Sequence, residues 1–258
     1  MYTTAPTGGD TVVVASASEV TMHEIKLVQP VVKTANEAFK RRRARPRIFP
    51  TIDSARTAHV IIDMQNGYME PGAAVEVPVG REIVGNVNAI SAAVRATGGI
   101  NIFVHYTTRE EDIANWSTWY SHFHDASSQK MMLEAFAPNT HSWNLWPGLD
   151  VVRGDVELEK SRFSAFVPGT CDLQQVLQSR NIETVIITGV ATNCCCESTA
   201  RDAMQLNYKV IFVADGNAAL TDDFHNASLN NLRHLYADIA MTDDVVRQLH
   251  EGQRTQSS

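Results

Sequence analysis

The chain has 258 residues, of which 44% are hydrophobic and 20% are charged, a composition typical of an ordinary soluble globular protein. Its formal net charge of −7 argues against a nucleic-acid-binding protein, and no apolar run approaches the roughly 18–20 residues of a membrane span. The N-terminus lacks a basic start followed by a long apolar stretch, so we expect no signal peptide.

The four cysteines are Cys171 and three consecutive residues at positions 194–196. Three cysteines in a row do not form the spaced partners of a secreted disulfide scaffold, and a disulfide between sequence neighbours is strained. No C-x2-C pair with a second Cys/His pair is present, which disfavours a zinc site. We therefore expect reduced thiols in a cytoplasmic protein, and no metal or other cofactor.

Residues 1–46 differ in character from the rest of the chain. They are mixed and polar, and they lead into a run with six basic residues at positions 40–47. A nuclear or RNA-binding signal is one interpretation of this run, but basic clusters alone are a weak signal. We favour an N-terminal arm that is partly extended or contacts another subunit, followed by one domain over residues 47–258. We expect no nucleic-acid or membrane partner.

Beyond the arm, short apolar runs typical of buried parallel strands alternate with segments of helical periodicity. The predicted strands are residues 59–64, 101–106, 155–159, 184–188, 209–214 and 238–241. The predicted helices are residues 81–96, 171–178, 195–206 and 223–236, with a last helix from Asp243. An aromatic-rich insert over residues 107–150 separates the second and third strands. The alternation predicts an α/β fold with a mostly parallel sheet that helices cover on both faces.

Neither G-x-G-x-x-G nor G-x-x-x-x-G-K-[ST] occurs in the chain, so the layout is Rossmann-like without a loop that cradles a pyrophosphate. Active sites in such sheets lie at the carboxyl ends of the strands. Three chemically capable residues fall at predicted strand ends: Asp63, Lys160 and Cys195. We expect them to meet in one site.

A candidate nucleophile lies where the fourth predicted strand runs into the next helix. Gly-Val-Ala-Thr-Asn follows the strand, and the three cysteines follow this turn. Unpaired N–H groups and the positive end of a helix dipole both favour a thiolate at such a position. Helical periodicity places Cys196 on the face of Ala200 and Ala203, which points inward. The same periodicity does not separate Cys194 from Cys195.

The three strand-end residues fit the needs of a thiol that attacks a carbonyl group. Asp63 follows an apolar run, where desolvation raises the basicity of a carboxylate. Lys160 would lower the proton affinity of the thiol and hold the carboxylate. The backbone N–H groups of Ala191 and Cys195 are candidates for an oxyanion hole. Taken singly, the residues also fit a turn cap, a surface lysine and a buried core thiol, but their joint placement favours catalysis.

Three motifs surround these positions: residues 61–66 (Ile-Ile-Asp-Met-Gln-Asn), residues 160–166 (Lys-Ser-Arg-Phe-Ser-Ala-Phe) and residues 189–203, which begin Gly-Val-Ala-Thr-Asn-Cys. With these motifs at this spacing, residues 55–250 resemble the isochorismatase-like cysteine hydrolase family.

The resemblance assigns roles and a fold. The family pattern, usually G-[VI]-x-T-x-x-C, places the nucleophile on Cys195. It matches Asp63 to the catalytic aspartate and Lys160 to the catalytic lysine. It also implies a six-stranded sheet in a Rossmann-like three-layer α/β/α sandwich, and a homo-oligomer that is a dimer or a tetramer. A cis peptide bond at Val190–Ala191, which would aim the Ala191 N–H at the oxyanion, is implied as well.

Within the family, the Ala-Thr-Asn-x-Cys-x-Glu-Ser-Thr form is most similar to amidohydrolases of small amides and ureido compounds, such as ureidoacrylate and N-carbamoyl substrates. The resemblance thus implies cleavage of a C–N bond in a small carboxamide or ureido/carbamoyl compound. Nicotinamidase members carry a metal-binding Asp with two histidines soon after the first motif, and this chain has no such D-x-H arrangement after Asp63. Members that cleave the vinyl ether of isochorismate lack the nucleophilic cysteine.

Three alternatives stay open at this point. One is hydrolysis of an ether or an ester on the same scaffold. Another is a non-catalytic oligomeric binding protein, against which the intact set of Asp63, Lys160 and Cys195 argues. The third is a thiol-based redox sensor built on the cysteines at positions 194–196, which peroxide-dependent labelling would detect.

The aromatic insert is the expected source of substrate selectivity, since its rings would wall a pocket for a flat group. Core or subunit contacts are the alternative role for the same rings. The predicted substrate contacts are Gln65, Trp116, Trp119, Phe163 and Thr192, with Phe123 beside the rings and Arg109 or His124 to recognise a substrate charge.

Overall fold

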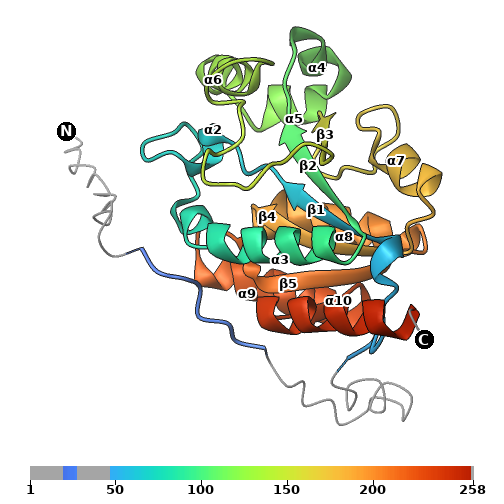
Figure 1. The fold of residues 1–258 in the computed structure, drawn as a ribbon. Helices are drawn as coiled ribbons and strands as arrows, with labels where there is room; N and C mark the ends of the chain where they lie inside the picture. Colours follow the sequence, from blue (N-terminus) through green and yellow to red (C-terminus); the bar gives the residue numbers. More distant parts are fainter. Residues whose placement is uncertain (1–19, 28–46, 257–258) are drawn as a thin grey trace, which may run out of the picture.

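The computed structural model describes residues 20–27 and 47–256 of the chain. The predicted N-terminal arm therefore falls mostly outside the described residues, as does the basic run apart from Arg47. Residues 20–27 of the arm lie against the domain (Figure 1). No helix within these two ranges is long and apolar enough to cross a membrane.

Six parallel strands form one sheet in the order β3-β2-β1-β4-β5-β6 (Figure 1). The strands are β1 (Thr57–Ile62), β2 (Ile100–Tyr106), β3 (Val156–Lys160), β4 (Thr184–Val190), β5 (Lys209–Ala218) and β6 (Asp238–Ala240). Each predicted strand is confirmed, with ends that differ by up to four residues. The sheet is wholly parallel, where a mostly parallel one was expected.

The central strands β1, β2 and β4 are buried along their whole length. Their β-branched residues pack on both faces, as expected of parallel strands between two layers of helices. In register, Ile62 at the end of β1 lies beside Val104 of β2 and Gly189 of β4. The carboxyl ends of these strands therefore meet at one edge of the sheet.

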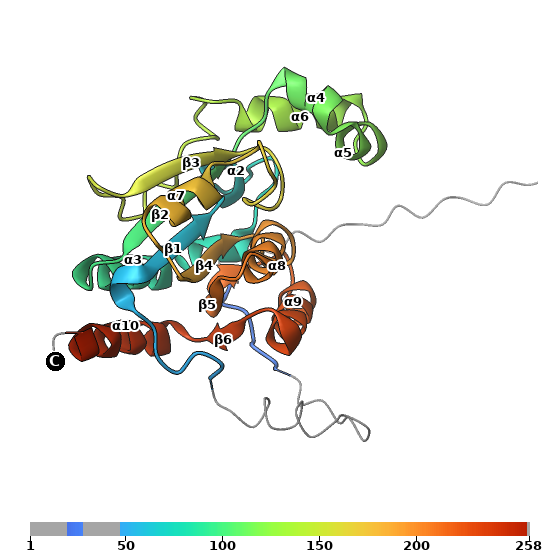
Figure 2. The ribbon, with the colours of Figure 1, turned by 90° about the vertical axis from the view of Figure 1, so that its right-hand side faces the viewer.

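Helices cover both faces of the sheet (Figure 2). α3 (Val84–Ala96) and α10 (Thr242–Gln256) lie on one face, where their side chains share a hydrophobic cluster with the sheet. α7 (Leu173–Ser179), α8 (Glu197–Gln205) and α9 (Asp222–Leu235) cover the other face. The expected three-layer α/β/α sandwich is confirmed.

The strand order reverses at β1 and β4. From β1 the chain adds β2 and β3 on one side, and then β4, β5 and β6 on the other. In open α/β sheets, ligands bind in the crevice outside the carboxyl ends of the strands at such a switch point. Asp63 directly follows β1, and Ala191 directly follows β4. The fold thus brings the predicted aspartate and the nucleophile turn to the same crevice.

The aromatic-rich insert folds into three short helices that the sequence analysis did not predict. They are α4 (Glu110–Asn115), α5 (Ser117–His122) and α6 (Ala126–Phe136). The remaining short elements are η1 (Ser54–Arg56), α2 (Asn66–Met69) and η2 (Pro78–Arg81). α4 and α5 have only six residues each, too few for helical periodicity to stand out in the sequence. The rings of Tyr106, Tyr120 and Phe136 hold the insert on the sheet in a hydrophobic cluster of its own.

Acid is expected to weaken the fold through His59, a buried residue of β1 whose ring nitrogens lie within hydrogen-bonding distance of the Ser91 and Thr188 hydroxyls. Burial lowers the pKa of this imidazole to about 3, whereas the unfolded chain titrates near the ordinary 6.5. Between these values only the unfolded state takes up the proton, so stability falls as the pH drops through 6.5.

We expect the wild type to lose about 2 kcal/mol more than His59→Gln between pH 7.5 and pH 5, measured by urea unfolding at both pH values. Glutamine keeps a hydrogen-bonding side chain and does not titrate. Equal losses in the two proteins would contradict the assignment to His59.

Candidate active site

Asp63 leaves the carboxyl end of β1 with a sharp change of direction. Its backbone φ of 56° lies in the left-handed region, which Asp tolerates better than most residues. Its N–H donates to the Val104 carbonyl of β2 at 2.9 Å, and its side chain is fully buried. A sparsely populated backbone conformation at a buried carboxylate is typical of functional sites.

Lys160 is the last residue of β3, and its side chain is fully buried as well. Because β2 separates β3 from β1, the side chain passes the end of β2, where Nζ lies 4.8 Å from the centroid of the Tyr106 ring. Nζ donates to Oδ2 of Asp63 at 2.8 Å and to the Arg162 carbonyl at 3.1 Å. A long, flexible side chain with a compact cation suits this reach across a strand.

The three cysteines form part of a π-helical turn, η3 (Thr192–Cys196), which leads into α8. The predicted helix over residues 195–206 is confirmed as α8, which begins two residues later than expected, at Glu197. Single π-helical turns are frequent at functional sites. Cys195 thus lies in a distorted turn before the helix, and the helix-dipole argument made from the sequence applies to it less directly.

The backbone on either side of Ala191 has an unusual course. The Val190–Ala191 peptide bond is cis. The Ala191 carbonyl accepts the N–H groups of Cys194 at 3.0 Å and Cys196 at 3.3 Å, so it closes the turn around Cys195. The donation of the Ala191 and Cys195 N–H groups to an oxyanion stays a prediction.

Gly189 allows β1 and β4 to approach each other closely just before Asp63 and the nucleophile turn. Its φ of 125° is open to glycine, and a Cβ at this position would lie 2.1 Å from the Ile62 carbonyl oxygen. That oxygen belongs to the backbone of β1 and cannot turn aside as a side chain can. Gly189 therefore sets the spacing between Asp63 and the nucleophile turn.

Burial and ion pairing act against each other in the Asp63–Lys160 pair. Burial raises the pKa of Asp63, although the Lys160 ammonium and the Cys195 thiol oppose the rise. Burial alone would lower the pKa of Lys160, but Asp63 and Cys195 together raise it above its ordinary value. Lys160 therefore stays a cation, and Asp63 is a stronger base than an exposed carboxylate. Oδ1 of Asp63 accepts no hydrogen bond within the described part of the chain, which leaves it open to a proton.

The three neighbouring thiols have different surroundings. Cys195 and Cys196 are buried, and Cys194 is partly exposed. Cys195 donates a hydrogen bond to Sγ of Cys194 at 4.0 Å; this bond, burial and the charge of Asp63 raise the pKa of Cys195. The same bond lowers the pKa of Cys194, and burial raises that of Cys196. In the resting site Cys195 is therefore a protonated thiol, and Asp63 beside it is the base available to take its proton.

Two predicted substrate contacts, Gln65 and Thr192, are buried and make hydrogen-bonding contacts within the protein. Gln65 is buried: its amide nitrogen donates to the carbonyls of Tyr106 at 3.0 Å and Trp143 at 2.8 Å, and its oxygen accepts the Tyr106 N–H at 2.7 Å. Oγ1 of the buried Thr192 lies 2.9 Å from Nδ1 of His225 in α9. Contact of these two side chains with substrate stays a prediction.

The other three predicted substrate contacts come together beside the catalytic groups. The ring centroids of Trp116 and Trp119 lie 4.8 and 5.0 Å from that of Phe163. Phe163 follows Lys160 by three residues and packs against the core cluster that contains Cys195. The aromatic cluster thus borders the site, and its contact with substrate stays a prediction.

Among the polar side chains of the insert, some have an ion-pair or hydrogen-bond partner within the described residues and others have none. Arg109, expected to recognise a substrate charge, forms an ion pair with Glu159. Nε1 of Trp119 and Nε2 of His124 are buried and have no hydrogen-bond partner among the described residues, and the two rings meet edge to face at 4.5 Å. Buried polar atoms without partners are rare and invite a ligand group.

The sequence analysis missed two tyrosines at the site. Burial, Asp63 and Cys195 raise the pKa of the Tyr68 phenol. Burial and Tyr120 raise that of Tyr106, and the same two catalytic groups add to the shift. Tyr106 ends the second predicted strand, so the strand-end rule that located Asp63 could have located it too. Tyr68 lies in the short helix α2, and no pattern in the sequence marks it.

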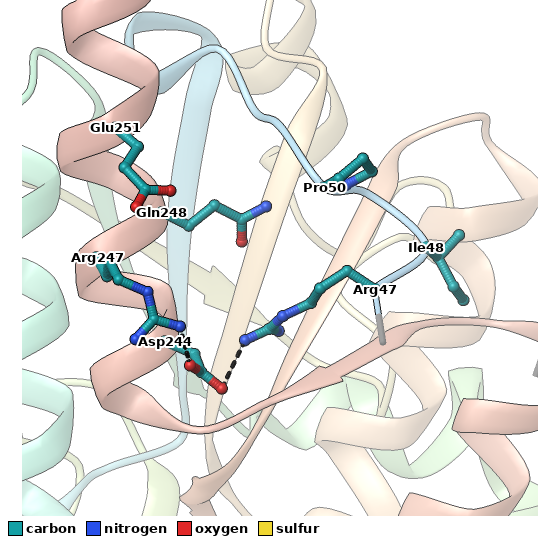
Figure 3. Close-up of a pocket in the computed structure, with 7 residues that line it drawn as sticks. All are labelled: Arg47, Ile48, Pro50, Asp244, Arg247, Gln248 and Glu251. Carbon is teal, nitrogen blue, oxygen red and sulfur yellow. Dashed lines mark hydrogen bonds and ion pairs between the residues drawn. The ribbon is translucent and has the colours of Figure 1, made fainter. Parts of the chain in front are cut away.

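A pocket of about 450 Å³ lies between α10 and residues 47–50 (Figure 3). Its lining consists of Arg47, Ile48, Pro50, Asp244, Arg247, Gln248 and Glu251. Asp244 pairs with both arginines, so the cations of this pocket are balanced within it. None of the predicted catalytic residues lines the pocket, and we assign it no part in catalysis.

Comparisons with known proteins agree with this geometry. A family model described as the isochorismatase domain matches residues 57–244. Among solved structures, a cysteine hydrolase from Pseudomonas syringae pv. phaseolicola is 26% identical, with a TM-score of 0.72 over 81% of this chain and 99% of that one.

Two more distant structures share the fold. An N-carbamoylsarcosine amidase from Thermoplasma acidophilum is 23% identical, with a TM-score of 0.58 over 73% of this chain and 97% of that one. A pyrazinamidase from Pyrococcus horikoshii, solved in complex with zinc, is 23% identical, with a TM-score of 0.59 over 72% and 99%. In residues 20–27 and 47–256 of the present chain, no three His, Cys, Asp or Glu side chains are grouped to hold a metal ion.

Removal of one partner of the buried ion pair is expected to destabilise the protein strongly. Lys160→Met should lower the free energy of unfolding by about 3–5 kcal/mol at pH 7, because it leaves the Asp63 carboxylate buried and uncompensated. Asp63→Asn in the same chain should recover most of this loss. Urea unfolding of both single variants and the double variant measures the coupling, and additive effects would show that the pair is not coupled.

Proposed function

The chain belongs to the isochorismatase family of hydrolases, and from this premise we propose that it cleaves a C–N bond in a small carboxamide or ureido/carbamoyl compound. Cys195 is the nucleophile of the proposed reaction. The observation that carries the proposal is the buried Asp63–Lys160 ion pair, at 2.8 Å, with the Cys195 thiol beside it. The likeness to a cysteine hydrolase at 26% identity supports a thiol mechanism.

The first half-reaction transfers the acyl group to sulfur. Oδ1 of Asp63 takes the proton of Cys195, and the thiolate attacks the substrate carbonyl carbon. The carbonyl electron pair moves onto oxygen, where the N–H groups of Ala191 and Cys195 donate to it. When the carbonyl re-forms, the C–N bond breaks and the nitrogen leaves with the proton from Asp63. The products are ammonia or an amine and a thioester on Cys195.

The second half-reaction releases the acid. Asp63, a carboxylate again, takes a proton from water as the water oxygen attacks the thioester carbonyl. The C–S bond breaks, the sulfur takes back its proton from Asp63, and the site returns to its starting state. Lys160 remains a cation throughout, and it limits the electrostatic cost of each negative charge that forms in this buried space.

The preference for an amide over an ether follows from this chemistry. The thiolate needs a carbonyl carbon, which the vinyl ether bond of isochorismate does not offer. The departing nitrogen needs a proton, which the buried Asp63 holds after the first step. The aromatic cluster of Trp116, Trp119 and Phe163 suits a flat amide or ureido group. Homo-oligomerisation and a cytoplasmic location stay predictions from the sequence.

A pH profile tests the role of Asp63. The carboxyl must be ionised to take the thiol proton, so kcat/KM is expected to fall as the pH drops through its pKa. Because burial raises that pKa above the ordinary 3.8, the acid limb should lie above pH 3.8. A limb at or below the ordinary value would contradict this assignment.

Ammonia release from a panel of small carboxamides and ureido acids tests the reaction. We expect release from at least one compound, and a loss of about 1,000-fold or more in Cys195→Ala. Cys194→Ala is the matched control, because it removes the neighbouring thiol and leaves Asp63 and Lys160 in place. Release that survives in Cys195→Ala but not in Cys194→Ala would move the nucleophile, and silence across the panel would refute the amidase proposal.

A further inference from the structure

Residues 20–27 lie along α9 at the edge of the domain (Figures 1 and 2). The Lys26 N–H donates to Oδ1 of Asn226 at 2.6 Å, and Nδ2 of Asn226 donates to the Glu24 carbonyl at 2.8 Å. One helical turn on, Nδ2 of Asn230 donates to the Lys26 carbonyl at 3.1 Å. The side chains of α9 thus bind both N–H and carbonyl groups of the backbone of this N-terminal segment.

His23 is the buried anchor of the segment. Its Nε2 accepts the Ala219 N–H at 2.9 Å, so the ring proton is on Nδ1, which donates to Oδ1 of Asp222 at 2.7 Å. Ala219 directly follows β5, and Asp222 begins α9. His23 therefore fastens the connection between this strand and this helix.

From His23, buried contacts lead to the nucleophile turn. The ring of His23 stacks on that of His225, with centroids 4.3 Å apart and 18° between the planes. His225 is fully buried in α9, and its Nδ1 lies 2.9 Å from Oγ1 of Thr192. Thr192 is the first residue of η3, directly after Ala191 and three residues before Cys195. The N-terminal segment is thus linked to the two residues of the proposed oxyanion hole.

The nucleophile turn depends on side-chain contacts for its position. π-helical turns are rare, and we expect this one to need support from the surrounding side chains. The contact between Thr192 and His225 is such a support, because it joins the start of the turn to a long helix. His23 stacks on the face of the His225 ring, whose edge contacts Thr192.

We propose that His23 and His225 are positioning residues of the active site. The stacked imidazoles hold Thr192, and Thr192 holds the backbone N–H groups of the nucleophile turn in the geometry that attack on a carbonyl requires. Both imidazoles act through Thr192 and not on the substrate. The part of the arm that the structure describes is therefore a component of the active site, and this proposal rests on the proposed function.

The first test compares His23→Ala and His225→Ala with Asn226→Ala. The asparagine variant removes two bonds between the segment and α9 but leaves the imidazole contacts intact. On a panel compound that is hydrolysed, we expect the histidine variants to lower kcat about tenfold or more with KM within about twofold, because they misplace catalytic groups and leave the aromatic cluster unchanged. Asn226→Ala should keep kcat within about twofold. His225→Asn, whose amide can still bond Thr192, should restore most of kcat.

A second readout does not require a known substrate. Alkylation of Cys195 by iodoacetamide can be followed across pH in a Cys194→Ala background, which removes the more exposed neighbouring thiol. Fragment-ion mass spectrometry then separates the label on Cys195 from any label on Cys196 in the same peptide. We expect the pH midpoint to shift by about half a unit or more in His23→Ala and His225→Ala, but not in Asn226→Ala. Circular dichroism establishes that each variant is folded.

An unchanged kcat and an unchanged midpoint in the folded histidine variants would overturn the proposal. Equal losses of kcat in Asn226→Ala would overturn it as well, since they would show that docking of the segment as a whole, and not the imidazole contacts, sustains the activity. If no panel compound is hydrolysed, the proposed function fails, and the alkylation midpoint alone decides whether the histidines position Cys195.

Discussion

The structure depends on the burial of two opposite charges side by side. Asp63 and Lys160 are both fully buried, and each would cost several kcal/mol in this place without the other. Their pairing joins the ends of β1 and β3, which are not neighbours in the sheet, across the end of β2. Both charges are shielded from solvent, so each acts more strongly on the Cys195 thiol than it would at the surface.

The three consecutive cysteines show how position alone separates identical side chains. The turn exposes Cys194 in part, buries Cys196 in the core and places Cys195 where Asp63 and Lys160 act on it. Gly189 makes this placement possible, because any Cβ there would collide with the backbone of β1. The reactivity of each of these cysteines thus depends on where the backbone places it, and residue type alone does not predict it.

Much of the fold could be predicted because its causes are local. Apolar runs located most of the six strands, the acidic segment over residues 155–159 being the exception, and the rule that functional residues follow parallel strands selected Asp63 and Lys160. Other features arise from tertiary packing. The π-helical turn at Cys195 contradicts its helical periodicity, and α4 and α5 are too short to show a period. Thr192 meets His225 across 33 positions, so its partner could not be read from the sequence around the turn.

The docking of residues 20–27 has a bearing on how the protein is made. His23 and Asp222 are 199 positions apart, so the segment leaves the ribosome long before α9 exists to receive it. Contacts between such distant parts of a chain form late, because the closure of a long loop costs entropy before the contacts compensate for it. A nascent chain can therefore build β1 to β4 and still lack the support of its nucleophile turn. Full reactivity of the thiol would then appear only when synthesis of the domain is nearly complete.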